Sequence, residues 1–188
     1  MSATAQTQEA AAPIPTEADA IDPMQAAEQA AEFGLDSAEA AALQKEVDEL
    51  IIETGGVQLA ANKVLWGDGS GVTTIPLPGE ERVRLDGGLQ AQASSAPCPV
   101  GRLCTYTERD YRGRMKEWFG CVYHHNFDYH GRWVSYVNNQ TGGARAHFGN
   151  GAQYGDDSDG YWVATPPAFS ANPASTKLLF ATEIRPCD

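Results

Sequence analysis

The sequence predicts an all-β domain at the C-terminus, preceded by a small acidic region with one helix and a β-hairpin. Beyond Cys98, short aromatic and β-branched runs such as MKEWFGCVY and TKLLFATEI alternate with Gly, Asn, Asp and Pro. This rhythm is typical of a β-sandwich or barrel. All four cysteines and all four histidines lie in this second half, whereas the first half is rich in Ala, Glu and Gln. The two halves therefore differ in residue composition, which favours two separate regions.

The charges divide the chain at the same place. Residues 1–95 carry sixteen acidic and four basic side chains, whereas residues 96–188 carry nine of each, so the first half accounts for the whole net charge of −12. A protein that tracks phosphates needs a positive surface, which this distribution does not provide. No apolar run approaches the ~20 residues that cross a bilayer. We therefore expect neither a nucleic-acid partner nor a membrane span.

Four segments are expected along the chain. Residues 1–22 contain almost no large apolar side chain, and such a segment is expected to be disordered. Residues 23–83 are predicted to form a helix plus β-hairpin accessory region, and residues 84–97 a polar linker. Residues 98–188 are predicted to form the all-β domain.

The accessory helix is predicted to begin at Asp36 and Ser37, which can cap its N-terminus, and to end at Gly55 and Gly56. Its apolar side chains recur at helical spacing: Leu43, Val47, Leu50 and Ile51. Two β-prone runs, VQLAANKVLW and VTTIPL, follow with GDGSG between them, which predicts a hairpin. Three roles stay open for this region: a prosegment, an independent binding domain, or a solubilising arm.

The cysteines indicate an oxidising compartment, because an even number is confined to one small domain and no CxxC pair typical of zinc sites is present. We expect disulfides among Cys98, Cys104, Cys121 and Cys187, for which three connectivities are possible. The first residues lack the apolar core of a signal peptide. We therefore expect an extracellular, secreted protein whose signal peptide is not part of this sequence.

The stretch CTYTERDYRGRMKEW resembles the opening hairpin of a βγ-crystallin Greek key. In that motif an aromatic residue starts the first strand, and an aromatic residue, any residue and Gly close a hairpin that folds over the sheet. Tyr106, Tyr111 and Gly113 fill these places, and Gly supplies the positive φ of the bend. Ser135 matches the serine that ties the folded hairpin to a later strand. The resemblance implies a βγ-crystallin-like Greek-key sandwich.

A closer resemblance is to the secreted actinobacterial metalloproteinase inhibitors, which have this fold. CPVGRLCTY is similar to the C-P-x-G-x-L-C-x-Y start of those proteins, and ARAHFGNGAQYG is similar to their second Greek key. The resemblance covers the C-terminal domain alone. It implies a peptidase inhibitor that binds thermolysin-like zinc proteases through a rigid, disulfide-braced loop. It also implies that Cys98 and Cys104 close the PVGRL loop, while Cys121 and Cys187 are expected to tie the chain end to the first Greek key.

The sequence departs from these inhibitors at the reactive loop. They have a second short disulfide around the reactive bond, whereas this chain reads DDSDGYWVATPP there, without cysteine. Residues 156–167 are the candidate inhibitory loop by position, and two prolines would stiffen its exit. Aromatic residues dominate binding hot spots, so the candidate contact residues are Tyr161, Trp162 and Val163. The alternative is that these three residues form a core strand after the DDSDG turn.

Calcium is a second possibility, because many βγ-crystallin modules bind it between Greek keys. Carboxylate oxygens suited to this ion are available on Asp156, Asp157 and Asp159. A weaker second set is Asn138, Asn139 and Thr141. Both sets lack the Ser-Ser or Thr-Ser ending of the family's calcium motif, and a solvated acidic turn is the alternative for the aspartates.

The run HHNFDYH brings His124, His125 and His130 close together, which suggests zinc or copper. Adjacent residues of a strand point to opposite faces, so we do not expect a metal site here. No catalytic constellation is recognisable. We therefore expect a non-enzymatic protein without an obligatory cofactor, which binds a secreted protease as a monomer. The alternative function is a βγ-crystallin-like calcium-binding or cell-surface stress module without inhibitory activity.

Overall fold

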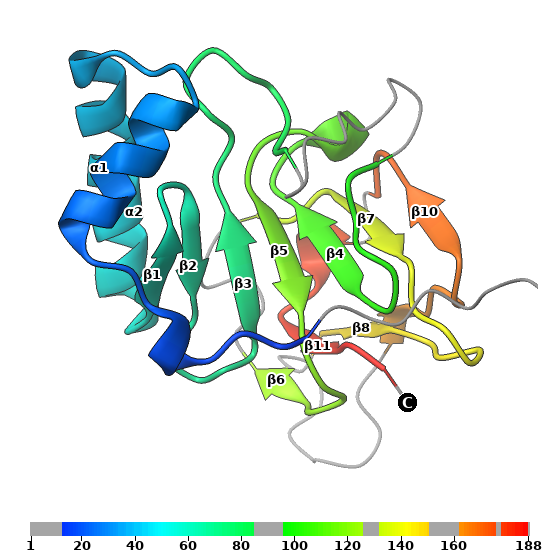
Figure 1. The fold of residues 1–188 in the computed structure, drawn as a ribbon. Coiled ribbons are helices and arrows are strands. Elements are labelled where there is room, and N and C mark those ends of the chain that lie inside the picture. Colours follow the sequence, from blue (N-terminus) through cyan, green and yellow to red (C-terminus); the bar gives the residue numbers. More distant parts are fainter. Residues whose placement is uncertain (1–12, 85–95, 126–131, 151–161, 176–177, 188) are drawn as a thin grey trace, which may run out of the picture.

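The computed structural model describes residues 13–84, 96–125, 132–150, 162–175 and 178–187. Within these residues the strands form two antiparallel sheets (Figure 1). The larger sheet has the strand order β1 (Val57–Ala60), β2 (Lys63–Leu65), β3 (Gly71–Thr74), β5 (Met115–Trp118), β4 (Leu103–Tyr106), β7 (Ser135–Asn138) and β10 (Ser170–Asn172). The smaller sheet has the order β6 (His124–His125), β11 (Glu183–Arg185), β8 (His147–Gly149) and β9 (Trp162–Ala164). The predicted all-β class is confirmed.

The predicted helix is α2, which spans Ser37–Thr54. The carboxylate of Asp36 accepts hydrogen bonds from the amides of Ala38 and Glu39 at 2.8 and 2.9 Å. Such a cap stabilises a helix by about 1 kcal/mol. Gly55 ends the helix in the left-handed conformation, with φ of 63°, as the Gly-Gly signal predicts.

A further helix, α1, spans Pro23–Glu32 and was not predicted. Asp22 caps it, and its buried side chains are Ala26 and Ala30. Alanines carry too little apolar surface to produce the periodic pattern of large residues on which a sequence-based helix prediction depends. The amide nitrogen of Ala61 donates to the side-chain oxygen of Gln29 at 2.9 Å, which fixes α1 beside the sheet.

The N-terminal segment predicted to be disordered lies partly outside the described residues. From residue 13 onward the structure describes it, with a short 3-10 helix at Glu17–Asp19. The amide of Ile21 donates to the carbonyl oxygen of Gln58 at 2.9 Å. In Figure 1 this segment, in dark blue, crosses below the N-terminal strands.

The predicted hairpin contains three strands, because its first run itself reverses direction. Strands β1 and β2 pair antiparallel, with Val57 opposite Leu65, and β2 pairs with β3. The turn between β1 and β2 falls at Ala61 and Asn62, and the side chain of Asn62 donates to the carbonyl oxygen of Ile75 at 2.7 Å. The single asparagine in VQLAANKVLW was too weak a turn signal to divide the run.

The N-terminal strands extend the sheet of the C-terminal half. Strand β3 pairs with β5 along its whole length, from Gly71 opposite Trp118 to Thr74 opposite Met115. A Cβ at Gly71 would lie 2.0 Å from the carbonyl oxygen of Glu117, so this close approach requires glycine. The accessory region and the C-terminal region therefore share one sheet, while the boundaries drawn between them stay a prediction.

Two apolar clusters account for most of the core. The cluster that includes residues of both sheets consists of Leu103, Trp118, Trp133, Ala146, Phe148, Leu178, Ala181 and Ile184. The cluster beneath α2 consists of Leu43, Val47, Leu50, Val64, Ile75 and Leu77. Burying a large aliphatic or aromatic side chain contributes about 1.5–3 kcal/mol. The apolar face predicted for α2 therefore covers the N-terminal strands.

Candidate functional site

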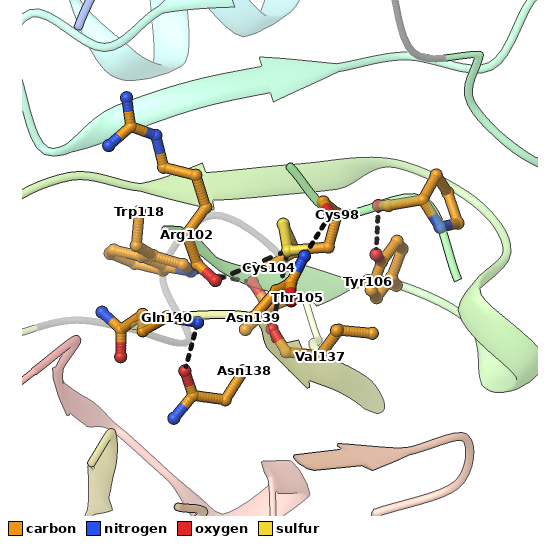
Figure 2. The surroundings of a disulfide bond; sticks show 11 residues. Cys98, Arg102, Cys104, Thr105, Tyr106, Trp118, Val137, Asn138, Asn139 and Gln140 are labelled. Carbon is orange, nitrogen blue, oxygen red and sulfur yellow. Dashed lines mark hydrogen bonds between the residues drawn. A yellow bond between two sulfur atoms is a disulfide. The ribbon is translucent and has the colours of Figure 1, made fainter. Parts of the chain in front are cut away.

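A disulfide closes the small loop at the start of the C-terminal region. Cys98 and Cys104 are bonded, with 5.8 Å between their Cα atoms, which is the pairing that the family resemblance implies. The side-chain amide of Asn139 donates to the carbonyl oxygen of Cys98, and its main-chain amide donates to that of Arg102, both at 2.9 Å (Figure 2). The amide of Gly101 donates back to the carbonyl oxygen of Asn139 at 2.8 Å. The loop is thus fixed to the residue that follows β7.

The four residues of the predicted hairpin corner lie together. The rings of Tyr106 and Tyr111 pack edge to face with 5.5 Å between centroids. The hydroxyl of Ser135 donates to the carbonyl oxygen of Glu108 at 2.6 Å and accepts from the amide of Tyr111 at 3.3 Å. Gly113 has φ of 72°, and a Cβ there would lie 2.4 Å from a side-chain oxygen of the same hairpin. The serine therefore ties the folded hairpin to β7.

Tyr106 also binds the chain segment just before Cys98. Its ring is fully buried, and its hydroxyl donates to the carbonyl oxygen of Pro97 (Figure 2). Burial, with a smaller contribution from Glu117, raises the pKa of the Tyr106 phenol well above its usual value. The phenol consequently stays a hydrogen-bond donor over the physiological pH range.

The second disulfide joins Cys121, which follows β5, to Cys187 near the chain end, with 4.6 Å between their Cα atoms. The pair is separated by 66 residues in sequence. Closing a segment of this length stabilises a fold by roughly 4 kcal/mol in the chain-entropy model. This is the pairing that was expected for the chain end.

The predicted inhibitory loop, residues 156–167, includes the end of the β8–β9 connection, strand β9 and the residues that follow it. Gly149 on β8 pairs with Trp162 on β9, so the two ends of the connection are side by side. Four candidate residues lie outside the described part of the chain: Tyr161, Asp156, Asp157 and Asp159. Trp162 and Val163 lie in β9, and Val163 packs against the core between the sheets. The contact role of these residues stays a prediction.

Asn138 fixes the segment that leaves β9. It is fully buried at the end of β7, and its side-chain amide donates to the carbonyl oxygen of Pro166 at 3.0 Å and to that of Ala144 at 3.3 Å. The amide of Ala146 donates to the same Pro166 oxygen at 3.1 Å. The side-chain oxygen of Asn138 accepts from the amide of Gln140 at 3.3 Å. Both polar atoms of the Asn138 side chain therefore bind main-chain groups of the protein.

Sequence reasoning had placed Asn138 in the weaker calcium set and had missed this structural role. Its partner Pro166 lies 28 positions away, and no local pattern reports a hydrogen bond over that distance. Asn139 likewise uses its amide group within the protein. Among the described residues, no group of three or more His, Cys, Asp or Glu side chains is arranged to hold a metal ion.

The histidine run is divided between described and undescribed residues. His124 and His125 form strand β6, and His130 lies outside the described residues. The ring of His124 lies 5.6 Å from that of Trp118, centroid to centroid. The environment of His124 is therefore aromatic.

A buried lysine joins the two halves of the molecule. Lys116 on β5 is fully buried, and its amino group donates to the hydroxyl of Ser70 at 2.8 Å. The same group lies over the rings of Trp66 and Trp118, 2.8 and 3.7 Å from their centroids. Burial lowers the pKa of Lys116 well below its usual value, and the carboxylate of Asp68 opposes this shift. Sequence reasoning missed this contact, because it depends on the pairing of β3 with β5.

These features define a disulfide-stapled protein of two β-sheets, in which β9 pairs with β8 and the segment after β9 is bonded to Asn138. Residues 91–161 match peptidase inhibitor family I36, and this segment includes the Cys98–Cys104 loop, the hairpin corner and strand β8. Comparison with curated proteins and with solved structures gives no match.

The predicted resemblance to a peptidase inhibitor family is thus confirmed for this segment. The family supports a peptidase inhibitor role and implies that the partner is a protease. It also implies that the protein is a non-enzymatic inhibitor. The disulfides and the family are compatible with an extracellular protein. None of the helices in the described ranges has the length and apolarity needed to cross a membrane.

Proposed function

We propose that this protein is a secreted inhibitor that binds a thermolysin-like metalloprotease in a one-to-one complex. The observation that carries the proposal is the match of residues 91–161 to a peptidase inhibitor family. The resemblance of CPVGRLCTY to the metalloproteinase inhibitors supports the choice of protease class. Two disulfides support secretion, because such bonds persist in oxidising compartments.

The surface that binds the protease is the connection from β8 to β9 together with the segment that follows β9. A protease inhibitor gains affinity when its contact segment is already ordered, because less conformational entropy is then lost on binding. The pairing of Gly149 with Trp162 supports this choice at one end. The hydrogen bonds on the carbonyl oxygen of Pro166 support it at the other.

Sheet pairing takes the place of the second short disulfide of the metalloproteinase inhibitors. In those inhibitors a covalent bond brackets the reactive segment, and this sequence has no cysteine there. Strand pairing between β8 and β9 and the side chain of Asn138 restrict the two ends of the segment instead. Such non-covalent restraints contribute about 1 kcal/mol per hydrogen bond, less than a covalent crosslink contributes.

The test is a titration of a thermolysin-like zinc protease with the full-length protein. Protease activity is expected to fall linearly and to reach its minimum at one equivalent of the oxidised protein. The matched control is the same protein after reduction and alkylation, which is expected to lose potency. A serine protease titrated in parallel reports on the protease class. Undiminished metalloprotease activity at an excess of the protein would contradict the proposal.

A further inference from the structure

An exposed aromatic side chain lies just beyond the proposed inhibitory segment. Phe169 occupies the turn between β9 and β10, of which β10 is the orange strand labelled at the right of Figure 1, and 72% of its surface is accessible. The preceding residues alternate in burial: Thr165 is exposed, Pro166 is buried and Pro167 is exposed. The buried proline holds the segment on the protein, so that the turn projects into solvent.

The backbone conformation of Phe169 is unfavourable for a bulky residue. Its φ is 57°, in the left-handed region that Gly, Asn and Asp adopt most readily. A large side chain in this conformation is normally stabilised by packing in the core, but the ring of Phe169 is mostly exposed. Neither backbone preference nor core packing explains a phenylalanine at this position. Residues held in such conformations cluster at binding sites.

The turn that carries Phe169 is supported on both sides. Before it, the carbonyl oxygen of Pro166 accepts hydrogen bonds from Asn138 and from Ala146. After it, β10 pairs with β7, beginning with Ser170 opposite Asn138. The hydroxyl of Ser170 donates across the turn to the carbonyl oxygen of Pro167. Both supports converge on the end of β7, so the position of Phe169 is fixed relative to the sheet.

We propose that Phe169 is the specificity-determining contact of the inhibitor, and that its ring enters the hydrophobic substrate pocket of the target protease. This inference rests on the function proposed above. Aromatic side chains dominate binding hot spots, and an exposed ring on a backbone turn that is already fixed needs little rearrangement on binding. The partner is therefore a protease that prefers a large apolar side chain in its substrates.

The test compares three variants of the full-length protein. Phe169→Asn removes the ring and suits the left-handed backbone, so its melting temperature is expected to equal or exceed that of wild type. Its inhibition constant is expected to rise by about 10- to 100-fold, the range of a hot-spot residue. Phe169→Trp keeps a large aromatic ring and is expected to retain inhibition. Val122→Asn, which removes another exposed apolar side chain, 66% accessible, is the matched control and is expected to inhibit as wild type does.

The outcomes separate this inference from the proposed function. If wild type inhibits the protease and Phe169→Asn inhibits it equally well, the role of Phe169 is overturned and the inhibitor function stands. Equal weakening by Phe169→Asn and Val122→Asn would also overturn it, because the effect would not be specific to the turn. Absence of inhibition by the wild type, with metallo-, serine, cysteine and aspartic proteases, would overturn both. Weakening confined to Phe169→Asn, with an unchanged melting temperature, supports the role of the ring.

Discussion

The side-chain amide of Asn138 lies 3.0 Å from the carbonyl oxygen of Pro166 and joins the larger sheet to the segment that leaves the smaller one. The hydrogen bond is fully buried on the Asn138 side. It therefore couples the order of the proposed inhibitory segment to the stability of β7.

Replacement of Asn138 is expected to affect both stability and inhibition. Asn138→Leu removes one of the two donors to the Pro166 carbonyl oxygen and leaves the buried amide of Gln140 without its acceptor, which costs about 1–3 kcal/mol of unfolding free energy, measurable by urea denaturation. Inhibition is expected to weaken as well, because the segment after β9 loses a restraint. Asn139→Leu is the control, since it removes a similar hydrogen bond at the Cys98–Cys104 loop. Equal loss of inhibition in both variants would show that the effect comes from stability alone.

Ser135→Ala is expected to loosen the hairpin corner. The hydroxyl has two hydrogen bonds to the folded hairpin and no exposed surface, so its removal is expected to lower the free energy of unfolding by about 1–3 kcal/mol. The control is Ser170→Ala, because that hydroxyl bonds at an exposed site. Thermal or chemical denaturation checks the difference. Similar stability of the two variants would argue against the corner as a structural element.

Lys116→Met is expected to change how stability depends on pH. Burial lowers the pKa of Lys116 in the folded protein, so the unfolded chain binds this proton more tightly. Between the folded pKa and about 10.4, the usual value for lysine, the unfolded state therefore carries more protons and wild-type stability rises with pH. Relative to Lys116→Met, wild type is expected to gain unfolding free energy as the pH rises from neutrality toward about 10.4.

Urea denaturation at several pH values measures this relative gain. A matched control is Lys45→Met, because the Lys45 side chain is 77% exposed. Surface substitutions normally change stability by less than about 0.5 kcal/mol. If the difference between wild type and Lys116→Met stayed constant over the whole range, the buried amino group would not be the source of the pH dependence.

Gly71→Ala is expected to weaken the junction between the halves. The new Cβ would meet the carbonyl oxygen of Glu117, which must move and thereby disturb the pairing of β3 with β5. A loss of about 2 kcal/mol or more in unfolding free energy is expected, since this is a backbone clash within the sheet. Gly69→Asn is the control, because that site has open space and a left-handed backbone that Asn tolerates. Hydrogen exchange of the β3 and β5 amides would locate the effect.

Local signals in the sequence were sufficient for several elements. Helix α2 was predicted because its cap, its apolar period and its terminating glycine lie within one stretch of chain. The hairpin corner was predicted from the resemblance of Tyr106, Tyr111 and Gly113 to a short βγ-crystallin motif, and the structure brings Ser135 to them.

Contacts between distant segments were not predictable in the same way. The pairing of Gly71 with Trp118 and the burial of Lys116 against Ser70 depend on which strand edges meet, and a single sequence contains no signal for that choice. Phe169 was missed for another reason: an exposed phenylalanine in a turn has no periodic pattern, and its left-handed backbone is visible only in coordinates.

The strand order of the two sheets determines which truncated fragments keep their strands paired. Among the described strands, residues 91–161 contain β4, β5, β6, β7 and β8, but their neighbours β3, β9, β10 and β11 come from outside that stretch. A fragment trimmed to it would expose unpaired edges on β5, β7 and β8, and open edges of this kind promote aggregation. Complete strand pairing therefore requires chain beyond the family-matched segment at both ends, including strand β3 of the N-terminal half.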